Sequence, residues 1–470
     1  MKTLFHIARF ILSVVIINTA SAQVIYKPSY NDLKRYQGVY EFTNHTTLQI
    51  AASPKDSMLY ALIGDSRYKL RPFSVDVFLN NGNEQVQFIR NGDKIEGFKQ
   101  QNDKPGTIYK LISTNVTFSD KMWYARQLKG SPFVYHYNVP QKKNDGLQTG
   151  SIINSGLDTA LIHTLVNRVV DGTYPNIHSV LIVKNGKLVF EEYFYEYDDK
   201  KSHELRSASK SFTSALVGIA IDKGLIKSIN DPMISYLPGY NYNNPDPRKK
   251  AITIKNLLTQ QSGLACYDYD PKSPGNEVKM YPTKDWIKFM LDLPMAGDPG
   301  KAAFYCSGNV MLLDRIVENV SHQSLHDFAR ENLFDKLGIS DFKLDFVPDY
   351  THEDDYGQVR LTSRDMAKFG LLYLNDGVWG GKQIISQEYV RQSLSKHSVV
   401  DDLNYGYLWW CEDLTANGIV YKGIAAKGNG GQRIFIWPEQ NMVAVITAGN
   451  YNTQSPANKL LIDCVLGGLK

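Results

Sequence analysis

The chain has 470 residues, of which 43% are hydrophobic and 21% are charged. This composition is ordinary for a globular protein and excludes disordered and fibrous classes, and the length is enough for two or more cores. Lysine and arginine number 52 against 48 aspartates and glutamates, which leaves a net charge of +4. So small a net charge does not indicate a nucleic-acid-binding protein, because binding to phosphates needs many positive charges.

The first residues have the pattern of a secretion signal. The basic residues Lys2 and Arg9 come first, and an apolar stretch follows at residues 10–17. Ala20-Ser21-Ala22 then resembles a cleavage site. We predict that residues 1–22 are a removed signal peptide and that the mature protein is periplasmic or secreted. No later stretch reaches the roughly 20 apolar residues of a spanning helix, and no cysteine follows the cleavage site to carry lipid. We therefore expect no membrane anchor.

Residues 23–115 are predicted to form a small β-rich domain. Short alternating segments lie at 47–50, 85–89 and 107–111, and they are separated by Asn-Gly and Pro-Gly turns. The opening segment 33–40, Leu-Lys-Arg-Tyr-Gln-Gly-Val-Tyr, resembles the start of lipocalin-like accessory domains attached to exported serine hydrolases. That resemblance implies a barrel-like fold with a supporting or ligand-contacting role.

Residues 116–150 are predicted to be a linker, and residues 151–470 a second domain. In that domain Asn154 is expected to cap a helix with apolar positions between Leu157 and Val169. Residues 178–194 alternate around Asn185-Gly186, which is a strong hairpin signal. Two more strands, 434–437 and 442–447, precede a helix around 456–466. Strands at both ends of the segment with helices between them predict an α+β fold, in which one antiparallel sheet is flanked by helices.

A serine and a lysine three residues apart suggest a nucleophile beside its base. Ser207 and Lys210 precede the apolar run 212–220, and residues three apart lie on one face of a helix. Burial favours neutral lysine, which is the form that takes a proton from serine. The same Ser-x-x-Lys pattern also occurs at Ser66, Ser340 and Ser393. The motif by itself therefore does not single out Ser207, which on its own also suits an ordinary helix cap.

Two further segments that can contribute to a site follow Ser207 along the chain. Tyr305-Cys306-Ser307 lies in a predicted loop, and Lys427-Gly428-Asn429-Gly430-Gly431 immediately precedes a strand. Together with Ser207 to Lys210, these segments resemble the serine β-lactamase and penicillin-binding-protein superfamily, particularly its class C-like and esterase branches. The resemblance covers residues 151–470 and implies the β-lactamase/transpeptidase-like fold, with a helical lobe beside the sheet.

The resemblance also implies a role for each residue. Ser207 would attack a carbonyl carbon, and Lys210 and Tyr305 would transfer protons. The backbone N–H groups of Ser207 and Asn429 would bind the oxyanion. Further substrate-binding residues of the same segments are Gly428, Gly430, Gly431 and Ser307.

Two departures from the family pattern bear on the substrate. Many relatives have Tyr-x-Asn where this chain ends in Ser307, and Lys-Thr-Gly where it has Lys427-Gly428-Asn429. The threonine hydroxyl helps to recognise a substrate carboxylate in those relatives. We therefore predict a serine hydrolase of a small ester or amide substrate. A β-lactamase or D-Ala-D-Ala carboxypeptidase is the alternative, and a catalytically silent binding module is an alternative of another class.

The remaining reactive residues suggest neither metal nor cofactor. Four cysteines allow three full pairings and lack Cys-x-x-Cys spacing. In the resembled family the loops that hold Cys266 and Cys306 line the cleft, which implies a disulfide between them. His322 and His326 have the spacing of a helical metal pair, but Ser324 and Asp327 predict a helix start between them. The oligomeric state and the identity of the acyl group are not predicted.

Overall fold

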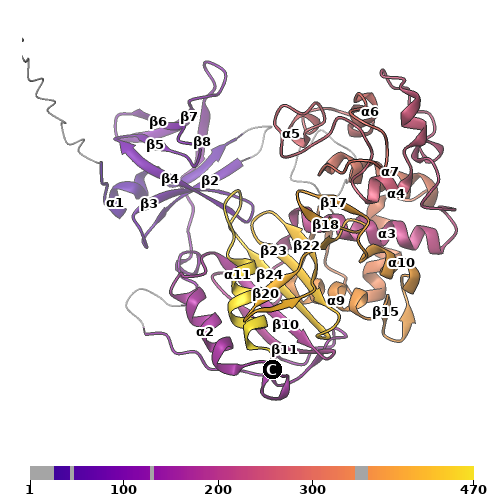
Figure 1. Cartoon of the computed structure of the whole chain (residues 1–470). Coiled ribbons are helices and arrows are strands. Elements are labelled where there is room, and N and C mark those ends of the chain that lie inside the picture. The colour runs from indigo at the N-terminus through magenta and orange to yellow at the C-terminus, as the bar shows by residue number, and fades with distance from the viewer. Residues whose placement is uncertain (1–25, 43–46, 127–131, 345–357) are drawn as a thin grey trace, which may run out of the picture.

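The computed structural model describes residues 26–42, 47–126, 132–344 and 358–470. These residues form a closed β-barrel, followed by a larger mixed domain (148–470) in which helices cover both faces of one sheet (Figure 1). The predicted fold class, a barrel-like domain followed by an α+β domain, is confirmed. The predicted signal peptide, residues 1–22, lies outside the described residues.

The barrel is an antiparallel meander that closes when β1 pairs with β8. Along β2, Leu48 and Ile50 are buried while Thr47 and Gln49 are exposed, which is the alternation expected when one face of a strand points inward. Its strands are β1 (Gly38–Glu41), β2 (Thr47–Ser53), β3 (Met58–Ile63), β4 (Ser66–Ser74), β5 (Val77–Leu79), β6 (Gln85–Asn91), β7 (Lys94–Gln100) and β8 (Tyr109–Ser113). The short helix α1 (Tyr30–Leu33) precedes them.

The mixed domain is built on a nine-stranded sheet. In spatial order its strands are β17 (Ser398–Val400), β18 (Leu403–Tyr405), β19 (Trp410–Cys411), β22 (Ile424–Gly428), β23 (Gln432–Trp437), β24 (Met442–Ala448), β10 (Ile177–Lys184), β11 (Lys187–Tyr193) and β9 (Gln148–Thr149). As predicted, strands from the two ends of the domain meet, because β10 pairs with β24. The sheet is antiparallel, as predicted, except at one edge, where the two-residue strand β9 pairs with β11 in parallel.

The predicted hairpin around Asn185-Gly186 is present as β10 and β11. Both turn residues have positive φ, 52° for Asn185 and 74° for Gly186. A two-residue turn of this hand matches the twist of the flanking strands, and asparagine and glycine adopt it at the least steric cost.

Each face of the sheet contributes to a separate core. In β24, Val443 and Val445 pack with the cluster that holds α3 and α7, whereas Ala444 and Ile446 pack with α2 and the C-terminal helices. The helices are α2 (Thr159–Val170), α3 (Lys210–Asp222), α4 (Ile254–Leu258), α5 (Glu277–Met280), α6 (Trp286–Asp292), α7 (Ser307–Ser321), α8 (Leu325–Ala329), α9 (Ser363–Leu374), α10 (Gln387–Ser393) and α11 (Ala457–Leu460). A sheet that is buried on both faces needs apolar residues at nearly every position, and β24 is buried throughout.

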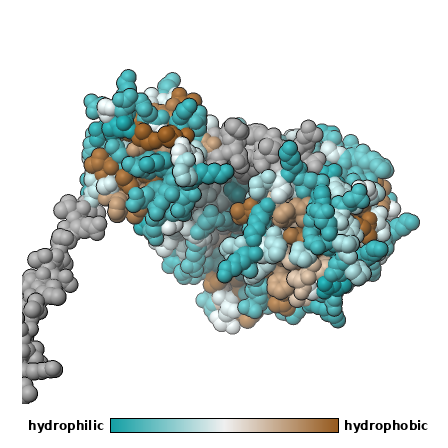
Figure 2. Space-filling model, turned by 90° about the horizontal axis from the view of Figure 1, so that it is seen from above, coloured by the Kyte–Doolittle hydropathy of each residue, from teal (hydrophilic) through white to brown (hydrophobic). Residues whose placement is uncertain are grey.

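Short strand pairs complete the mixed domain. They are β12 (His203–Glu204) and β13 (Lys343–Leu344), which both pair with β14 (Val359–Leu361), then β15 (Val378–Trp379) with β16 (Lys382–Gln383), and β20 (Leu414–Ala416) with β21 (Ile419–Tyr421). Figure 2 shows apolar patches on the barrel and a hollow between the barrel and the mixed domain. Among the described helices, none is long and apolar enough to cross a membrane.

The predicted start of the first long helix is wrong. Asn154 ends a short 3₁₀ turn, and α2 begins at Thr159. Its cap is Asp158, whose carboxylate accepts hydrogen bonds from the backbone N–H groups of Ala160 and Leu161. Asparagine and aspartate cap helices about equally well, so residue type alone does not select between them.

One carboxyl group is completely buried between α3 and α7. Asp314 has no exposed surface, and its Oδ1 accepts a hydrogen bond from the Thr213 hydroxyl at 2.8 Å. Its other oxygen, Oδ2, has no hydrogen-bond partner among the described residues. Burial raises the pKa of Asp314 to about 8, so this side chain is a neutral acid at pH 7.

Asp314→Asn should remove a pH-dependent loss of stability. Because the folded pKa is about 8 and the ordinary value is 3.8, the native state keeps a proton that the unfolded chain releases. Wild-type stability therefore falls as pH rises from about 4 to 8, by at most about 1.4 kcal/mol per pH unit from this group. Urea unfolding at several pH values should show that the free energy of unfolding of the variant rises relative to that of the wild type as pH increases from about 4 to 8. Asp413→Asn, at an exposed aspartate, is the matched control; parallel pH profiles for wild type and Asp314→Asn would contradict a buried neutral acid.

Candidate active site

Ser207 lies in a tight turn just before a buried helix. Residues Arg206–Ser209 form a 3₁₀ helix, and α3 begins only at Lys210. The expectation that Ser207 itself opens an α-helix is therefore corrected by one turn. Ser207 and Lys210 are three residues apart across the junction of the two helices, a spacing that puts their side chains on the same face. The Lys210 Nζ donates a hydrogen bond to Ser207 Oγ at 3.1 Å, and Lys210 is only 8% exposed.

The turn before Ser207 is strained and is held from two sides. Arg206 has a φ of 50°, which is uncommon for a residue other than glycine. Its guanidinium pairs with the buried Glu204 carboxylate at 2.9 Å. The Leu205 N–H donates to the Val359 carbonyl at 3.0 Å, which ties the turn to β14. These contacts orient the serine.

Tyr305 lies against Lys210 and is held between two aromatic rings. Its ring stacks on Tyr269 and on Trp410, with centroid distances of 5.3 and 5.7 Å. Lys210 Nζ lies 5.1 Å from the centre of the Tyr305 ring. Burial raises the pKa of Tyr305 above its ordinary range, although hydrogen bonding with Ser207 lowers it. Tyr305 is therefore a neutral phenol near pH 7.

The predicted disulfide between Cys266 and Cys306 is present. It joins the loop that carries Tyr269 to the residue that follows Tyr305. The Asp268 N–H also donates to the Tyr305 carbonyl at 2.9 Å. The two loops therefore hold the Tyr305 ring in place together.

Ser307 faces two carboxyl groups that sequence reasoning missed. Its hydroxyl donates to Glu277 Oε2 at 2.7 Å, and its backbone N–H donates to Asp268 Oδ2 at 2.6 Å. Burial and the neighbouring Glu277 raise the pKa of Asp268 to about 6, although the charge of Lys210 lowers it. No sequence motif predicts that these two carboxyl groups lie together, because Asp268 lies in a loop and Glu277 begins α5. Lys210 therefore lies close enough to Asp268 for their charges to interact.

The predicted glycine segment forms the turn between β22 and β23, beside the serine. A Cβ at Gly428 would come within 2.1 Å of the Leu205 carbonyl oxygen, so only glycine lets β22 pack this closely on the turn. Gly430 and Gly431 have φ of 92° and 105°. The Asn429 side chain exchanges two hydrogen bonds with Asn452.

Lys427 forms an ion pair within the protein. Its Nζ pairs with Glu412 at 2.8 Å and lies over the Trp410 ring. Its positive charge is therefore compensated within the protein.

The other Ser-x-x-Lys copies are not part of this arrangement. Ser66 is the first residue of β4 in the barrel, Ser393 ends α10, and Ser340 is exposed in a loop.

His322 ends α7 in a left-handed conformation and His326 lies in α8, so the two histidines belong to different elements, as predicted. Among the described residues, no group of three metal-ligating side chains comes together.

Residues 173–463 match the family model described as Beta-lactamase. The chain belongs to the beta-lactamase family. It is a serine hydrolase of that family. The match begins just before β10 and ends near the C-terminus, so it contains all the site residues described above.

Known proteins of this family resemble the chain over the mixed domain. It is 27% identical to the 6-aminohexanoate-dimer hydrolase of Paenarthrobacter ureafaciens over 294 residues, which is 56% of this chain and 70% of that protein. A solved structure of a putative beta-lactamase from Bacteroides dorei shares the fold with a TM-score of 0.52 and 20% identity, covering 64% of this chain and 97% of that one. A family VIII carboxylesterase shares it with a TM-score of 0.54 and 16% identity, over 67% and 98% of the two chains.

Gly428→Ala should impair the site without unfolding the domain. The new Cβ meets the Leu205 carbonyl, so β22 must move away from the serine turn. Loss of one oxyanion donor typically lowers turnover about a hundredfold or more, and we expect kcat for an activated ester to fall on that scale. Gly297→Ala is the matched control, because a Cβ there meets nothing within 4 Å. Equal kcat for both variants, with both folded by circular dichroism, would contradict the close packing.

Proposed function

We propose that this protein is an exported hydrolase that cleaves an ester or a small amide through an acyl-enzyme on Ser207. The observation that carries the proposal is the 3.1 Å hydrogen bond between Lys210 Nζ and Ser207 Oγ beside the glycine turn. A serine hydroxyl becomes a useful nucleophile only when an adjacent base removes its proton.

Lys210 and Tyr305 each carry out a different proton transfer. In its neutral form, Lys210 accepts the Ser207 proton while Oγ bonds to the carbonyl carbon. Tyr305, kept as a phenol by burial, donates its proton to the leaving oxygen or nitrogen and regains one from Lys210. Water then attacks the acyl carbon, and the same groups act in reverse to release the acid and restore Ser207.

The oxyanion is assigned to two backbone donors. The Ser207 N–H is one, and the Asn429 N–H at the end of β22 is the other. The close packing of Gly428 on Leu205 supports this assignment, because it brings the turn beside Ser207. The Asn429 side chain is engaged with Asn452, so only its main chain takes part.

Charges in the site favour a neutral substrate. Penicillins and D-Ala-D-Ala peptides carry a carboxylate that needs a cation. Lys427 is already paired with Glu412, and Arg206 with Glu204. The nearby Asp268 and Glu277 would repel an anion. The names of the related 6-aminohexanoate-dimer hydrolase and carboxylesterase also point to amides and esters.

Export is part of the proposal. The secretion pattern in residues 1–22 suggests it, and the Cys266–Cys306 disulfide supports it, because disulfides persist in oxidising compartments.

A fluorophosphonate probe should label Ser207. We expect one adduct on the wild type, located by peptide mass spectrometry, and none on Ser207→Ala. Ser340→Ala is the matched control, since Ser340 belongs to another Ser-x-x-Lys copy and is exposed. Failure of the folded wild type to react, or reaction elsewhere, would refute Ser207 as the nucleophile.

The same preparation separates the substrate classes. Nitrophenyl esters of short acids should turn over at least a hundredfold faster, by kcat/KM, than nitrocefin or D-Ala-D-Ala peptides. The opposite order would identify a β-lactamase or carboxypeptidase.

A further inference from the structure

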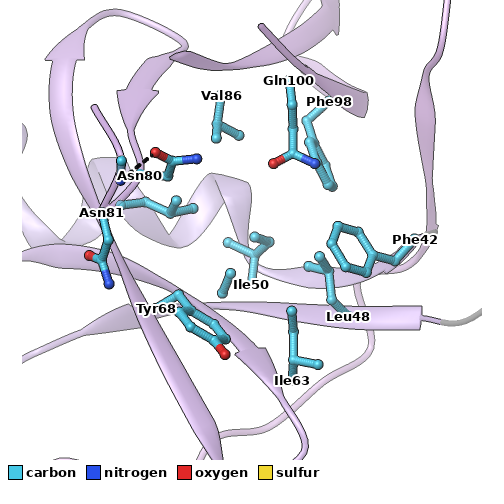
Figure 3. Close-up of a pocket in the computed structure, with 13 residues that line it drawn as sticks. Phe42, Leu48, Ile50, Ile63, Tyr68, Asn80, Asn81, Val86, Phe98 and Gln100 are labelled. Carbon is cyan, nitrogen blue, oxygen red and sulfur yellow. Dashed lines mark hydrogen bonds between the residues drawn. The ribbon is translucent and has the colours of Figure 1, made fainter. Parts of the chain in front are cut away.

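The barrel holds an apolar cavity of about 260 Å³ that is partly open to solvent (Figure 3). Inward-facing positions of neighbouring strands line it: Leu48 and Ile50 of β2, Ala61 and Ile63 of β3, and Val86 of β6. Leu48, Ile50 and Val86 are each at most 3% exposed, so the walls belong to the barrel core. An apolar void of this size forfeits packing contacts that native cores normally make.

Aromatic rings fill another part of the barrel interior. The rings of Tyr36, Tyr40, Phe78 and Phe88 pack edge to face or tilted, with Tyr36 and Phe78 5.1 Å apart. The cavity lies at the end where β3 turns into β4 and β5 into β6, because its wall continues into Asn81 and Gly82 of the second turn. The aromatic cluster and the cavity are therefore distinct parts of the barrel.

The lining defines the chemistry of an occupant. No charged side chain is among the thirteen lining residues, whereas the amides of Asn81 and Gln100 stand at the edge. Apolar cavities exclude water and accept small apolar molecules instead. At about 30 Å³ of liquid volume per water-sized group, the space suits roughly nine non-hydrogen atoms.

We propose that the barrel cavity is a binding site for a neutral aliphatic molecule of medium chain length, with its polar end at Asn81 and Gln100. The chain fills the apolar space, and the amides bond a hydroxyl or carbonyl group at the mouth. A carboxylate is disfavoured because no cationic side chain is among the described residues that line the cavity.

Calorimetric titration of the full-length protein with 1-octanol tests this site. We expect one saturable site, at least tenfold weaker binding of octanoate, and no binding of 1,6-hexanediol. Ala61→Phe places a ring in the cavity and should weaken octanol binding at least twentyfold, and Val86→Phe serves if the first variant does not fold. Ile112→Phe, on the outside of β8 and 55% exposed, is the matched control and should bind like the wild type.

Two results would overturn the proposal. One is the absence of saturable octanol binding to the folded wild type. The other is unchanged binding to folded Ala61→Phe or Val86→Phe, which would put octanol elsewhere.

A separate set of contacts joins the barrel to the turn that carries Ser207. Asp65, between β3 and β4, is buried against the mixed domain. Its carboxylate accepts hydrogen bonds from the Tyr197 hydroxyl at 2.9 Å, from the Arg360 guanidinium at 2.9 Å and from the Glu204 N–H at 3.2 Å. Glu204 and Arg360 are opposite each other in the β12–β14 pair, and Ser207 follows β12 by three residues.

We infer that Asp65 is a positioning residue for Ser207, supplied by the barrel. It holds β12 and β14 together at the point where the strained turn at Arg206 begins. This inference rests on the proposed role of Ser207.

Asp65→Asn tests the inference through kinetics. We expect kcat for a nitrophenyl ester and the rate of fluorophosphonate labelling each to fall about tenfold, with KM within twofold of the wild type. Asp76→Asn is the matched control: Asp76 forms an ion pair with Arg90 at 2.6 Å inside the barrel domain, away from the mixed domain. Its kcat should be unchanged.

The outcomes separate the two claims. Absence of labelling in the wild type would overturn both the nucleophile and this inference. Normal wild-type labelling with an unchanged kcat in Asp65→Asn, or an equal loss in Asp76→Asn, would overturn only the role of Asp65.

Discussion

The pairing of β10 with β24 is the constraint on which the rest of the mixed domain depends. It joins strands from opposite ends of that domain, with partners such as Val180 and Ile446. Once it forms, β22 and β23 extend the sheet toward the helical lobe. Gly428 then reaches the Leu205 carbonyl, and two segments more than two hundred residues apart build one site. Such long-range pairing costs chain entropy, and the two buried faces of the sheet offset it.

Rigidity at the site comes from neighbours that do no chemistry. The disulfide at Cys306 and the rings of Tyr269 and Trp410 leave Tyr305 little freedom. Glu204 holds the strained Arg206 turn, and Asp65 of the barrel holds Glu204. Preorganised donors and acceptors of this kind need no rearrangement during reaction. The barrel thus contacts the segment that leads to Ser207, and it also holds a cavity of its own.

Predictions from short sequence motifs are confirmed where the residue type determines the backbone conformation. Asn185-Gly186 predicted its hairpin because both positions need positive φ. The helix cap was misplaced, because Asn154 and Asp158 are chemically equivalent candidates four residues apart. Ser207 was placed at the start of an α-helix, although the chain makes a 3₁₀ turn there that depends on contacts with β14. Propensity does not report such distant contacts.

The sequence by itself determined the order of Ser207, Tyr305 and the glycine turn, the two architectures, and the family resemblance. Strand alternation and turn chemistry are local properties, so they can be read along the chain. Only the tertiary structure decided which Ser-x-x-Lys copy lies against a phenol, that Asp268 and Glu277 face Ser307, and that Lys427 is compensated by Glu412. It also placed Asp65 of the barrel against Glu204, three residues before Ser207, because charges and hydrogen bonds act through space between residues that no sequence spacing relates.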